Sequence, residues 1–132
     1  MIVADASAIV QACLSQVDLE GLGQLELVSP PLLWSEVTSA LHELRWRREI
    51  SAALADRGVE RFRELRVGRR RPARLYEEAW RLANQFGWAK TYDAEYVALA
   101  RLLRCRLLTI DSKLVAVASR VAEVVGPAEL TS

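Results

Sequence analysis

Apolar and polar residues follow two patterns along this chain. Short unbroken apolar runs bounded by turn-forming residues indicate buried strands. They are expected at 2–4, 25–28, 107–110 and 121–125, with a brief edge strand at 65–67. Apolar residues recurring every three or four positions indicate amphipathic helices. These are expected at 8–15, 31–48, 52–65, 73–86 and 93–104, whereas 18–23, with two glycines, is expected to be a loop.

Alternation of strands and helices defines the fold class. It predicts an α/β protein with a mainly parallel central sheet between two helical layers, which is a three-layer α/β/α sandwich. We expect residues 1–132 to form a single domain. No apolar run approaches the ~20 residues of a membrane span, and no secretory leader is visible, so a cytoplasmic protein without membrane association is expected. Cys13 and Cys105 match no metal-ligand spacing and are expected to be reduced and buried.

Charge is unevenly distributed, although the formal net charge is only +1. The segment from Arg45 to Arg74 contains eleven arginines and four acidic residues. Most of these charges can pair on solvated helix faces. Three consecutive arginines at 69–71 have no nearby acid, which favours contact with an anionic partner for that loop.

Acidic residues collect at one predicted edge of the sheet. Asp5 and Asp111 each follow a strand, and Asp93 and Glu36 each lie near the start of a helix. For Asp93 or Asp111 taken alone, a helix start is a more frequent explanation than chemistry. Together, however, four carboxylates converging without matching cations would repel one another unless a divalent cation neutralised them. All-oxygen ligation favours Mg²⁺ or Mn²⁺, and such an ion can support phosphodiester hydrolysis.

Four sequence blocks carry a resemblance to a known family. Residues 1–10 read Met-Ile-Val-Ala-Asp-Ala-Ser-Ala-Ile-Val, and residues 30–37 read Pro-Pro-Leu-Leu-Trp-Ser-Glu-Val. Residues 92–100 read Tyr-Asp-Ala-Glu-Tyr-Val-Ala-Leu-Ala, and residues 107–114 read Leu-Leu-Thr-Ile-Asp-Ser-Lys-Leu. In this order and spacing they resemble PIN-domain proteins, in particular the VapC ribonuclease toxins of type II toxin–antitoxin pairs.

The resemblance implies a PIN-like sandwich and an Mg²⁺- or Mn²⁺-dependent endoribonuclease that hydrolyses RNA. It implies an acidic quartet at Asp5, Glu36, Asp93 and Asp111, in which Asp5 and Asp93 are the main metal ligands. Ser7 and Thr109 match hydroxyl positions beside the acids and are expected to have supporting roles. One departure is Ser39, which stands where many relatives have an asparagine.

The resemblance also implies partners. VapC-like proteins form homodimers and are silenced by a cognate VapB-like antitoxin, which often places a basic side chain among the acids. RNA is expected to contact Arg69, Arg70 and Arg71, and Trp46 is expected to stack on bases. For Trp80 we expect core or dimer packing, because its neighbours follow the helical period.

Two other functions compete with this interpretation. A PIN-like module that binds RNA or protein without catalysis would share the fold. A receiver-type signalling domain is also a small α/β fold with acids and Mg²⁺. It needs an adjacent pair of acids after the first strand, whereas this chain has a single acid within Ala4-Asp5-Ala6.

Overall fold

Five short parallel strands form the central sheet of the computed structural model, which describes residues 1–130. The order across the sheet is β3 (Val67–Arg69), β2 (Leu27–Ser29), β1 (Ile2–Ala4), β4 (Arg106–Leu108) and β5 (Val124–Val125). In the central strand, Val3 pairs with Val28 on one side and with Leu107 on the other. The predicted parallel sheet is thus confirmed, and β3 is an edge strand as expected.

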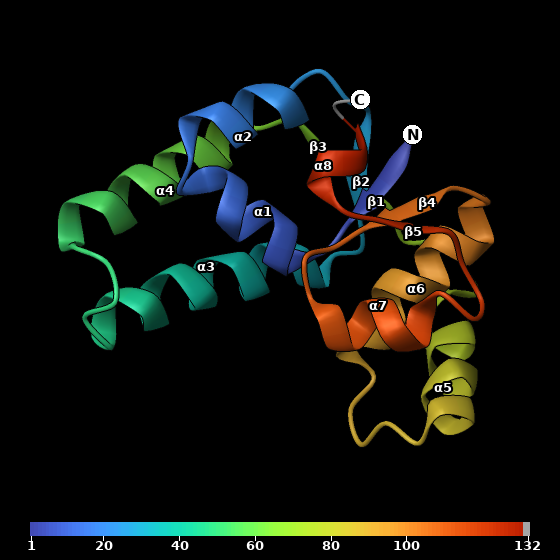
Figure 1. The fold of residues 1–132 in the computed structure, drawn as a ribbon. Coiled ribbons are helices and arrows are strands. Elements are labelled where there is room, and N and C mark those ends of the chain that lie inside the picture. The colour runs from blue at the N-terminus through green and yellow to red at the C-terminus, as the bar shows by residue number, and fades with distance from the viewer. Residues whose placement is uncertain (131–132) are drawn as a thin grey trace.

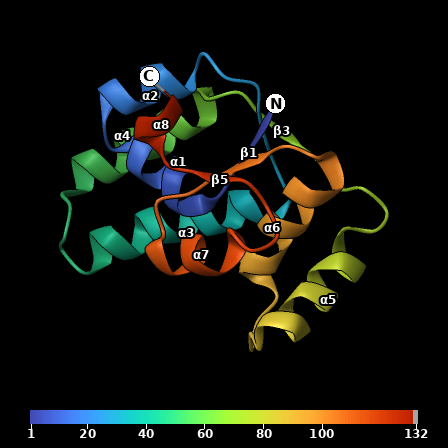
Figure 2. The ribbon, with the colours of Figure 1, turned by 45° about the vertical axis from the view of Figure 1, so that its right-hand side comes forward.

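Helices cover both faces of the sheet. Figures 1 and 2 show α1 to α4 gathered on one side and α5 and α6 on the other. The strand order explains this arrangement. From β1 to β3 each strand is added on the same side of the previous one, and β4 and β5 are then added on the other side of β1. Because crossover connections between parallel strands are right-handed, this reversal places the later helices on the opposite face. The helices are α1 (Ala6–Cys13), α2 (Gln16–Leu22), α3 (Leu32–Trp46), α4 (Ala52–Glu64), α5 (Leu75–Phe86), α6 (Tyr92–Leu103), α7 (Ser112–Ala118) and α8 (Pro127–Leu130).

The reversal of strand order creates a special position at the carboxyl ends of β1 and β4. These neighbouring strands leave the sheet toward helices on different sides, so their following loops diverge. In open α/β sheets, ligands bind in the crevice at such a switch point. Asp5 follows β1 directly, and Thr109 follows β4 directly.

The core lies on both faces of the strands. Ile2, Val3 and Leu107 are almost fully buried in the sheet, and Leu41 and Leu99 pack on its two sides from α3 and α6. Helix α6 is buried from Ala94 to Ala100, which accounts for its nearly continuous apolar sequence. Burial of this apolar area is the main stabilising contribution to the fold.

Several predicted boundaries are wrong. Residues 16–22 form helix α2 and not a loop, because Ser15 caps the helix through the N–H of Asp18 and Gly21 is tolerated within it. Helix α1 begins at Ala6, two residues early, because Asp5 is its N-cap. Strand β3 begins at Val67, and β5 is limited to Val124–Val125. The expected end of α5 is confirmed: Gly87 has φ +70°, a left-handed conformation that glycine adopts without strain.

Candidate active site

All four predicted acids lie at the carboxyl edge of the sheet. Asp5 leaves β1, and Asp111 lies three residues after β4 as the N-cap of α7. Glu36 lies in the first half of α3, which follows β2, and Asp93 lies in the first turn of α6. The fold therefore delivers acids from four separate elements to the switch point between β1 and β4.

Asp5 is held by a set of hydrogen bonds in a buried position with 5% exposure. Its Oδ1 accepts hydrogen bonds from Ser7 Oγ at 2.7 Å and from the N–H of Ala8 at 3.0 Å. Its Oδ2 accepts a hydrogen bond of 2.5 Å from Thr109 Oγ1, which in turn accepts one from the N–H of Asp111 at 3.0 Å. The two hydroxyl residues selected from the sequence thus both contact Asp5, and Thr109 connects it to the Asp111 loop.

Glu36 is held from across the domain by a residue that sequence reasoning treated only as core. Tyr96 on α6 has 1% exposure, and its hydroxyl donates a hydrogen bond to Glu36 Oε1 at 2.5 Å. Burial, and then the hydrogen bond to Glu36 and its negative charge, raise the pKa of Tyr96 far above its ordinary value. The helical period predicted the burial of the ring but not the direction of its hydroxyl.

Glu95 is a further acid that the sequence analysis missed. It lies in the first turn of α6 with 7% exposure, and burial and the charge of Glu36 raise its pKa. The available signal was a charged residue inside the apolar run from Ala94 to Ala100. Because Glu95 lies next to Glu36, it adds to the negative charge at this edge of the sheet.

The other two acids differ from each other in their contacts. Asp111 Oδ1 accepts hydrogen bonds from the N–H groups of Lys113 at 2.9 Å and Leu114 at 3.3 Å, as an N-cap does. The side chain of Asp93 accepts no hydrogen bond from any residue between 1 and 130. Asp93 is therefore the acid that the protein leaves freest to adjust.

Mutual repulsion and burial perturb these groups. Burial raises the pKa of Asp5 and of Glu36, and the charge of Asp93 raises both further. Partial burial and the charge of Asp111 raise the pKa of Asp93. Within the described part of the chain, none of the four acids forms an ion pair with a basic group. The edge therefore carries negative charge that the protein itself does not neutralise.

A hard divalent cation suits this donor set in chemistry. The available ligands are carboxylate oxygens supported by hydroxyls, without histidine or thiolate, which is the ligand type of Mg²⁺ and Mn²⁺. Their positions are less suitable. Between residues 1 and 130, no three side chains of aspartate, glutamate, histidine or cysteine lie close enough together to bind one ion. An ion at this edge would have to draw the acids together.

The predicted RNA-contacting residues are spread over the surface. Arg69 lies over the ring of Trp34, 4.4 Å from the ring centroid. Trp34 precedes Glu36 by two residues in the sequence. Arg70 points instead to the Sδ of Met1 at 3.8 Å, and Arg71 lies 6.0 Å from the ring centroid of Tyr76. Consecutive residues leave the end of β3 in different directions, so the three arginines do not form one patch.

Two tryptophans on different helices are strongly exposed. Trp46 has 76% exposure at the C-terminal end of α3, about 15 Å along the helix from Glu36. Trp80 on α5 has 67% exposure, so it does not pack in the core of this chain, and packing in a dimer stays a prediction. Its flanking residues Ala79 and Leu82 are buried, which shows that the period was read correctly but Trp80 lies on the outer face. Ser39 is exposed on α3, three residues after Glu36.

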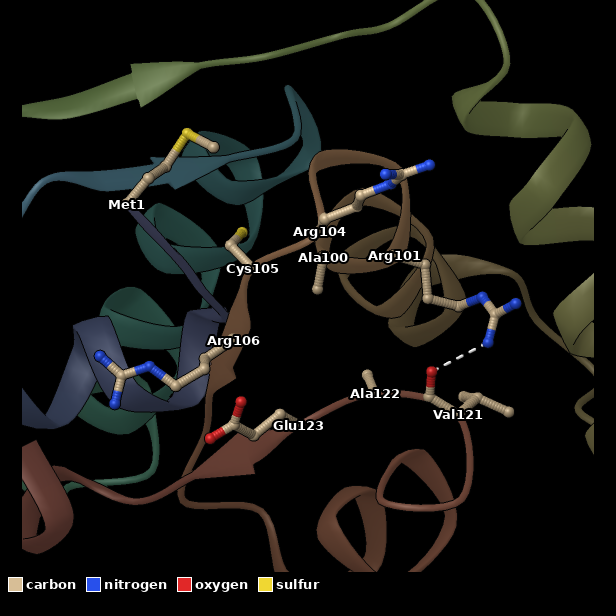
Figure 3. Close-up of a pocket in the computed structure, with 9 residues that line it drawn as sticks. All are labelled: Met1, Ala100, Arg101, Arg104, Cys105, Arg106, Val121, Ala122 and Glu123. Carbon is tan, nitrogen blue, oxygen red and sulfur yellow. Dashed lines mark hydrogen bonds between the residues drawn. The ribbon is translucent and has the colours of Figure 1, made fainter.

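A separate hollow of about 590 Å³ lies at the opposite, amino edge of the sheet (Figure 3). It is bordered by Arg101, Arg104 and Arg106, and Arg101 donates a hydrogen bond to the carbonyl of Val121 at 2.9 Å. Arg101 and Arg104 lie at the C-terminal end of α6, where cations are stabilised by the unpaired carbonyls of the helix. Helix capping explains these charges, and the hollow is not part of the acidic site.

The chain belongs to the PIN-domain family, whose model matches residues 2–120. The match covers the sheet from β1 to β4 together with all four acids. No helix between residues 1 and 130 is both long enough and apolar enough to cross a bilayer.

Among proteins of this family, the chain is similar to VapC ribonuclease Mb0985 of Mycobacterium bovis and Ribonuclease VapC9 of Mycobacterium tuberculosis. Each is 38% identical over 115 residues, covering 86% of this chain and 88% of the relative. The fold is similar to that of PAE2754 from Pyrobaculum aerophilum, with a TM-score of 0.73, 23% identity, and coverage of 98% of this chain and 93% of the other. A PilT N-terminus domain protein, SSO1118 from Sulfolobus solfataricus, gives a TM-score of 0.55 at 17% identity, covering 98% and 88%. Because the chain belongs to the PIN-domain family, the alternative of a receiver-type signalling domain is wrong.

Proposed function

We propose that this protein is a metal-dependent endoribonuclease and the toxin of a VapBC-like toxin–antitoxin pair. The observation that carries the proposal is the group of four acids at the switch point, which repel one another and have no basic partner between residues 1 and 130. The names of the two mycobacterial relatives, both ribonucleases, support RNA as the substrate. We place this activity in the cytoplasm, where its RNA substrate is found.

Each acid has a proposed role. Asp5 and Asp93 would hold Mg²⁺ or Mn²⁺, and Glu36 and Asp111 would complete the site directly or through water. When bound, such an ion supplies a Lewis acid and an activated water for phosphodiester hydrolysis. Asp5 is oriented for this role by Ser7 and Thr109, whose hydroxyls contact its two different oxygens.

RNA cleavage with and without metal tests the proposal. The parent protein should cleave RNA with Mg²⁺ or Mn²⁺ and stop in excess EDTA, and Asp5→Ala and Asp93→Asn should abolish cleavage. Asp56→Asn is the matched control, because it removes an exposed carboxylate on α4 that is remote from the acidic edge. Cleavage that continued unchanged in EDTA would refute the metal mechanism.

We propose that the arginines of residues 69–71 and Trp46 contact the RNA outside the reacting phosphate. Arg69 supports this because it lies against Trp34, close in sequence to Glu36. Replacing Arg69, Arg70 and Arg71 by glutamine should weaken RNA binding and reduce its logarithmic salt dependence by about 2, at roughly 0.7 per phosphate contact. A charge-matched control replaces Arg57, Arg63 and Arg66, and an equal loss in both variants would assign the effect to net charge alone.

An antitoxin would have a suitable surface beside the acids. An apolar hollow of about 450 Å³ between α1 and α3 is lined by Val10, Leu14 and Leu44, and it reaches Ser7 and Ile110 next to Asp5. We propose that an apolar segment of a VapB-like antitoxin lies there and places a basic side chain among the unneutralised carboxylates. Val10→Asp should weaken this complex without affecting RNA cleavage by the free toxin, as measured by co-purification and cleavage assays.

A homodimer is the proposed assembly of the toxin itself. The exposed Trp80 supports it, because large aromatic side chains are enriched in protein interfaces. Light scattering of the parent and of Trp80→Ala would distinguish a dimer from a monomer.

A non-catalytic binding module is the second candidate function. The observation that favours it is the lack, between residues 1 and 130, of three acids already gathered around one ion position. It predicts RNA binding without cleavage at any Mg²⁺ or Mn²⁺ concentration, whereas the proposed nuclease requires cleavage.

A further inference from the structure

A single buried hydroxyl connects the two helices that supply Glu36 and Asp93. Tyr96 on α6 donates its hydrogen bond to Glu36 on α3, at 2.5 Å and across sixty positions of sequence. Between residues 1 and 130, no other side-chain hydrogen bond joins these two helices. Tyr96 lies three residues after Asp93, so one turn of α6 carries both the acid and the phenol.

We propose that Tyr96 is a positioning residue that binds Glu36 Oε1 and thereby leaves Oε2 as the oxygen available to a metal ion or its water. The inference rests on the proposed function, because it gives Glu36 a defined part in holding the ion. It also explains how an acid on α3 keeps a constant position relative to Asp93 on α6.

The rigidity of each partner supports this role. Tyr96 lies in the fully buried stretch of α6, with Val97 and Leu99 at 0% exposure beside it, so its ring cannot change position without disturbing the core. Glu36 is only half-buried and has a longer, more flexible side chain than the three aspartates. The fixed hydroxyl of Tyr96 therefore restricts the more mobile carboxylate of Glu36, and not the reverse.

The other acids obtain their orientation in different ways. Asp5 is fixed by three donors, and Asp111 by the backbone at the start of α7. Glu36 accepts no other hydrogen bond from residues 1–130, so without Tyr96 nothing in this part of the chain would orient it. Among residues 1–130, the Tyr96 hydroxyl is thus the one hydrogen-bond donor that orients the Glu36 carboxylate.

A buried tyrosine also needs a hydrogen-bond partner for its own stability, and this purely structural role must be separated from positioning. Tyr96→Phe removes the hydroxyl but retains the ring that fills the core. Tyr92→Phe is the matched control, because Tyr92 lies one turn earlier on the same helix, is 49% exposed, and donates no hydrogen bond within residues 1–130. Glu36→Gln and the double variant Glu36→Gln/Tyr96→Phe complete a double-mutant cycle.

Mn²⁺ binding without RNA is measured by titration calorimetry at pH 7.5, below the thermal midpoint of every variant, with folding checked by circular dichroism. Tyr96→Phe should bind Mn²⁺ about 10-fold more weakly, which is typical for loss of a residue that orients a ligand, and Tyr92→Phe should match the parent. In the Glu36→Gln background, Tyr96→Phe should have no further effect, because its influence passes through Glu36.

Two results would overturn the inference while leaving the proposed function intact. One is Mn²⁺ affinity unchanged by Tyr96→Phe. The other is an equal loss from Tyr96→Phe with glutamate or glutamine at position 36, which would mean a general structural effect. A parent protein that bound no Mn²⁺ would refute the proposed metal site and, with it, this role for Tyr96.

Discussion

Replacement of Thr109 by valine tests how strongly the hydrogen bonds at the acidic edge stabilise the fold. Thr109 has 1% exposure, and valine has nearly the same shape, so packing changes little. The substitution removes the 2.5 Å hydrogen bond to Asp5 Oδ2. It also removes the acceptor of the Asp111 N–H at 3.0 Å.

The expected loss follows mainly from these two contacts, because the third contact of Thr109 Oγ1, with Ser7 Oγ, is longer at 3.3 Å and Ser7 keeps its hydrogen bond to Asp5. A hydrogen bond to a charged group contributes roughly 1.5–3 kcal/mol, and a neutral one about 1 kcal/mol. The sum predicts that Thr109→Val lowers the free energy of unfolding by about 3 kcal/mol. For a domain of this size, a change of 1 kcal/mol corresponds to about 4 °C in Tm, so the midpoint should fall by about 12 °C.

Urea and thermal unfolding in EDTA would measure the effect in the metal-free protein. Thr38→Val is the matched control, because Thr38 bonds only the carbonyl of Trp34 within its own helix and is exposed, so its loss should stay within about 0.5 kcal/mol. If Thr109→Val were as mild as the control, the hydroxyl would not hold Asp5, and its supporting role would be refuted.

Three further substitutions or treatments have defined outcomes. Asp93→Asn should raise the Tm of metal-free protein at neutral pH, because burial and the charge of Asp111 raise the pKa of Asp93, and the gain should vanish below the ordinary pKa of 3.8 in pH-dependent melting. Glu78→Gln should lower the Tm at pH 7, and the difference from the parent should shrink as pH falls below 4.5 and through the folded pKa. The hydrogen bond from Arg81 lowers the pKa of Glu78, so its stabilisation is present above the ordinary value of 4.5 and is lost as pH falls through the folded pKa. Thiol labelling of native protein should modify Cys105 first, because it is half-buried and not buried as expected, whereas Cys13 is fully buried. Burial raises the pKa of both thiols, that of Cys13 to about 11, and equal labelling rates would contradict this order.

Positions set by chain direction could be predicted from the sequence, whereas positions set by side-chain direction could not. Asp5 and Asp111 follow strands, and parallel strands place their carboxyl ends at one edge, so their meeting was accessible from spacing alone. The bond between Tyr96 and Glu36 was not, because a helical period predicts that a ring is buried but not where its hydroxyl points. Helix α2 was missed because Gly21 within it and Gly23 directly after it outweighed the cap at Ser15.

The arginines at 69–71 show the same limit on a charged segment. Adjacent like charges suggested one anion-binding surface, but successive residues at the end of a strand project to opposite sides. Arg69 accordingly lies on Trp34 while Arg70 reaches Met1. Charge counting therefore identified the basic segment correctly but could not determine which of its members share a face.

The unequal hydrogen bonding of the four acids reconciles a charged site with the lack of preformed three-ligand geometry within residues 1–130. Asp5, Glu36 and Asp111 are held by donors from the protein, which offset part of their desolvation. Asp93 has no donor among these residues, and its charge raises the pKa of both Asp5 and Glu36. A divalent ion would therefore remove the largest uncompensated repulsion by attracting Asp93, while the other three acids keep their orientation. On this argument hydrogen bonds orient three of the acids in advance, and under the proposed function the remaining step is to bring the acids, Asp93 above all, within reach of one ion.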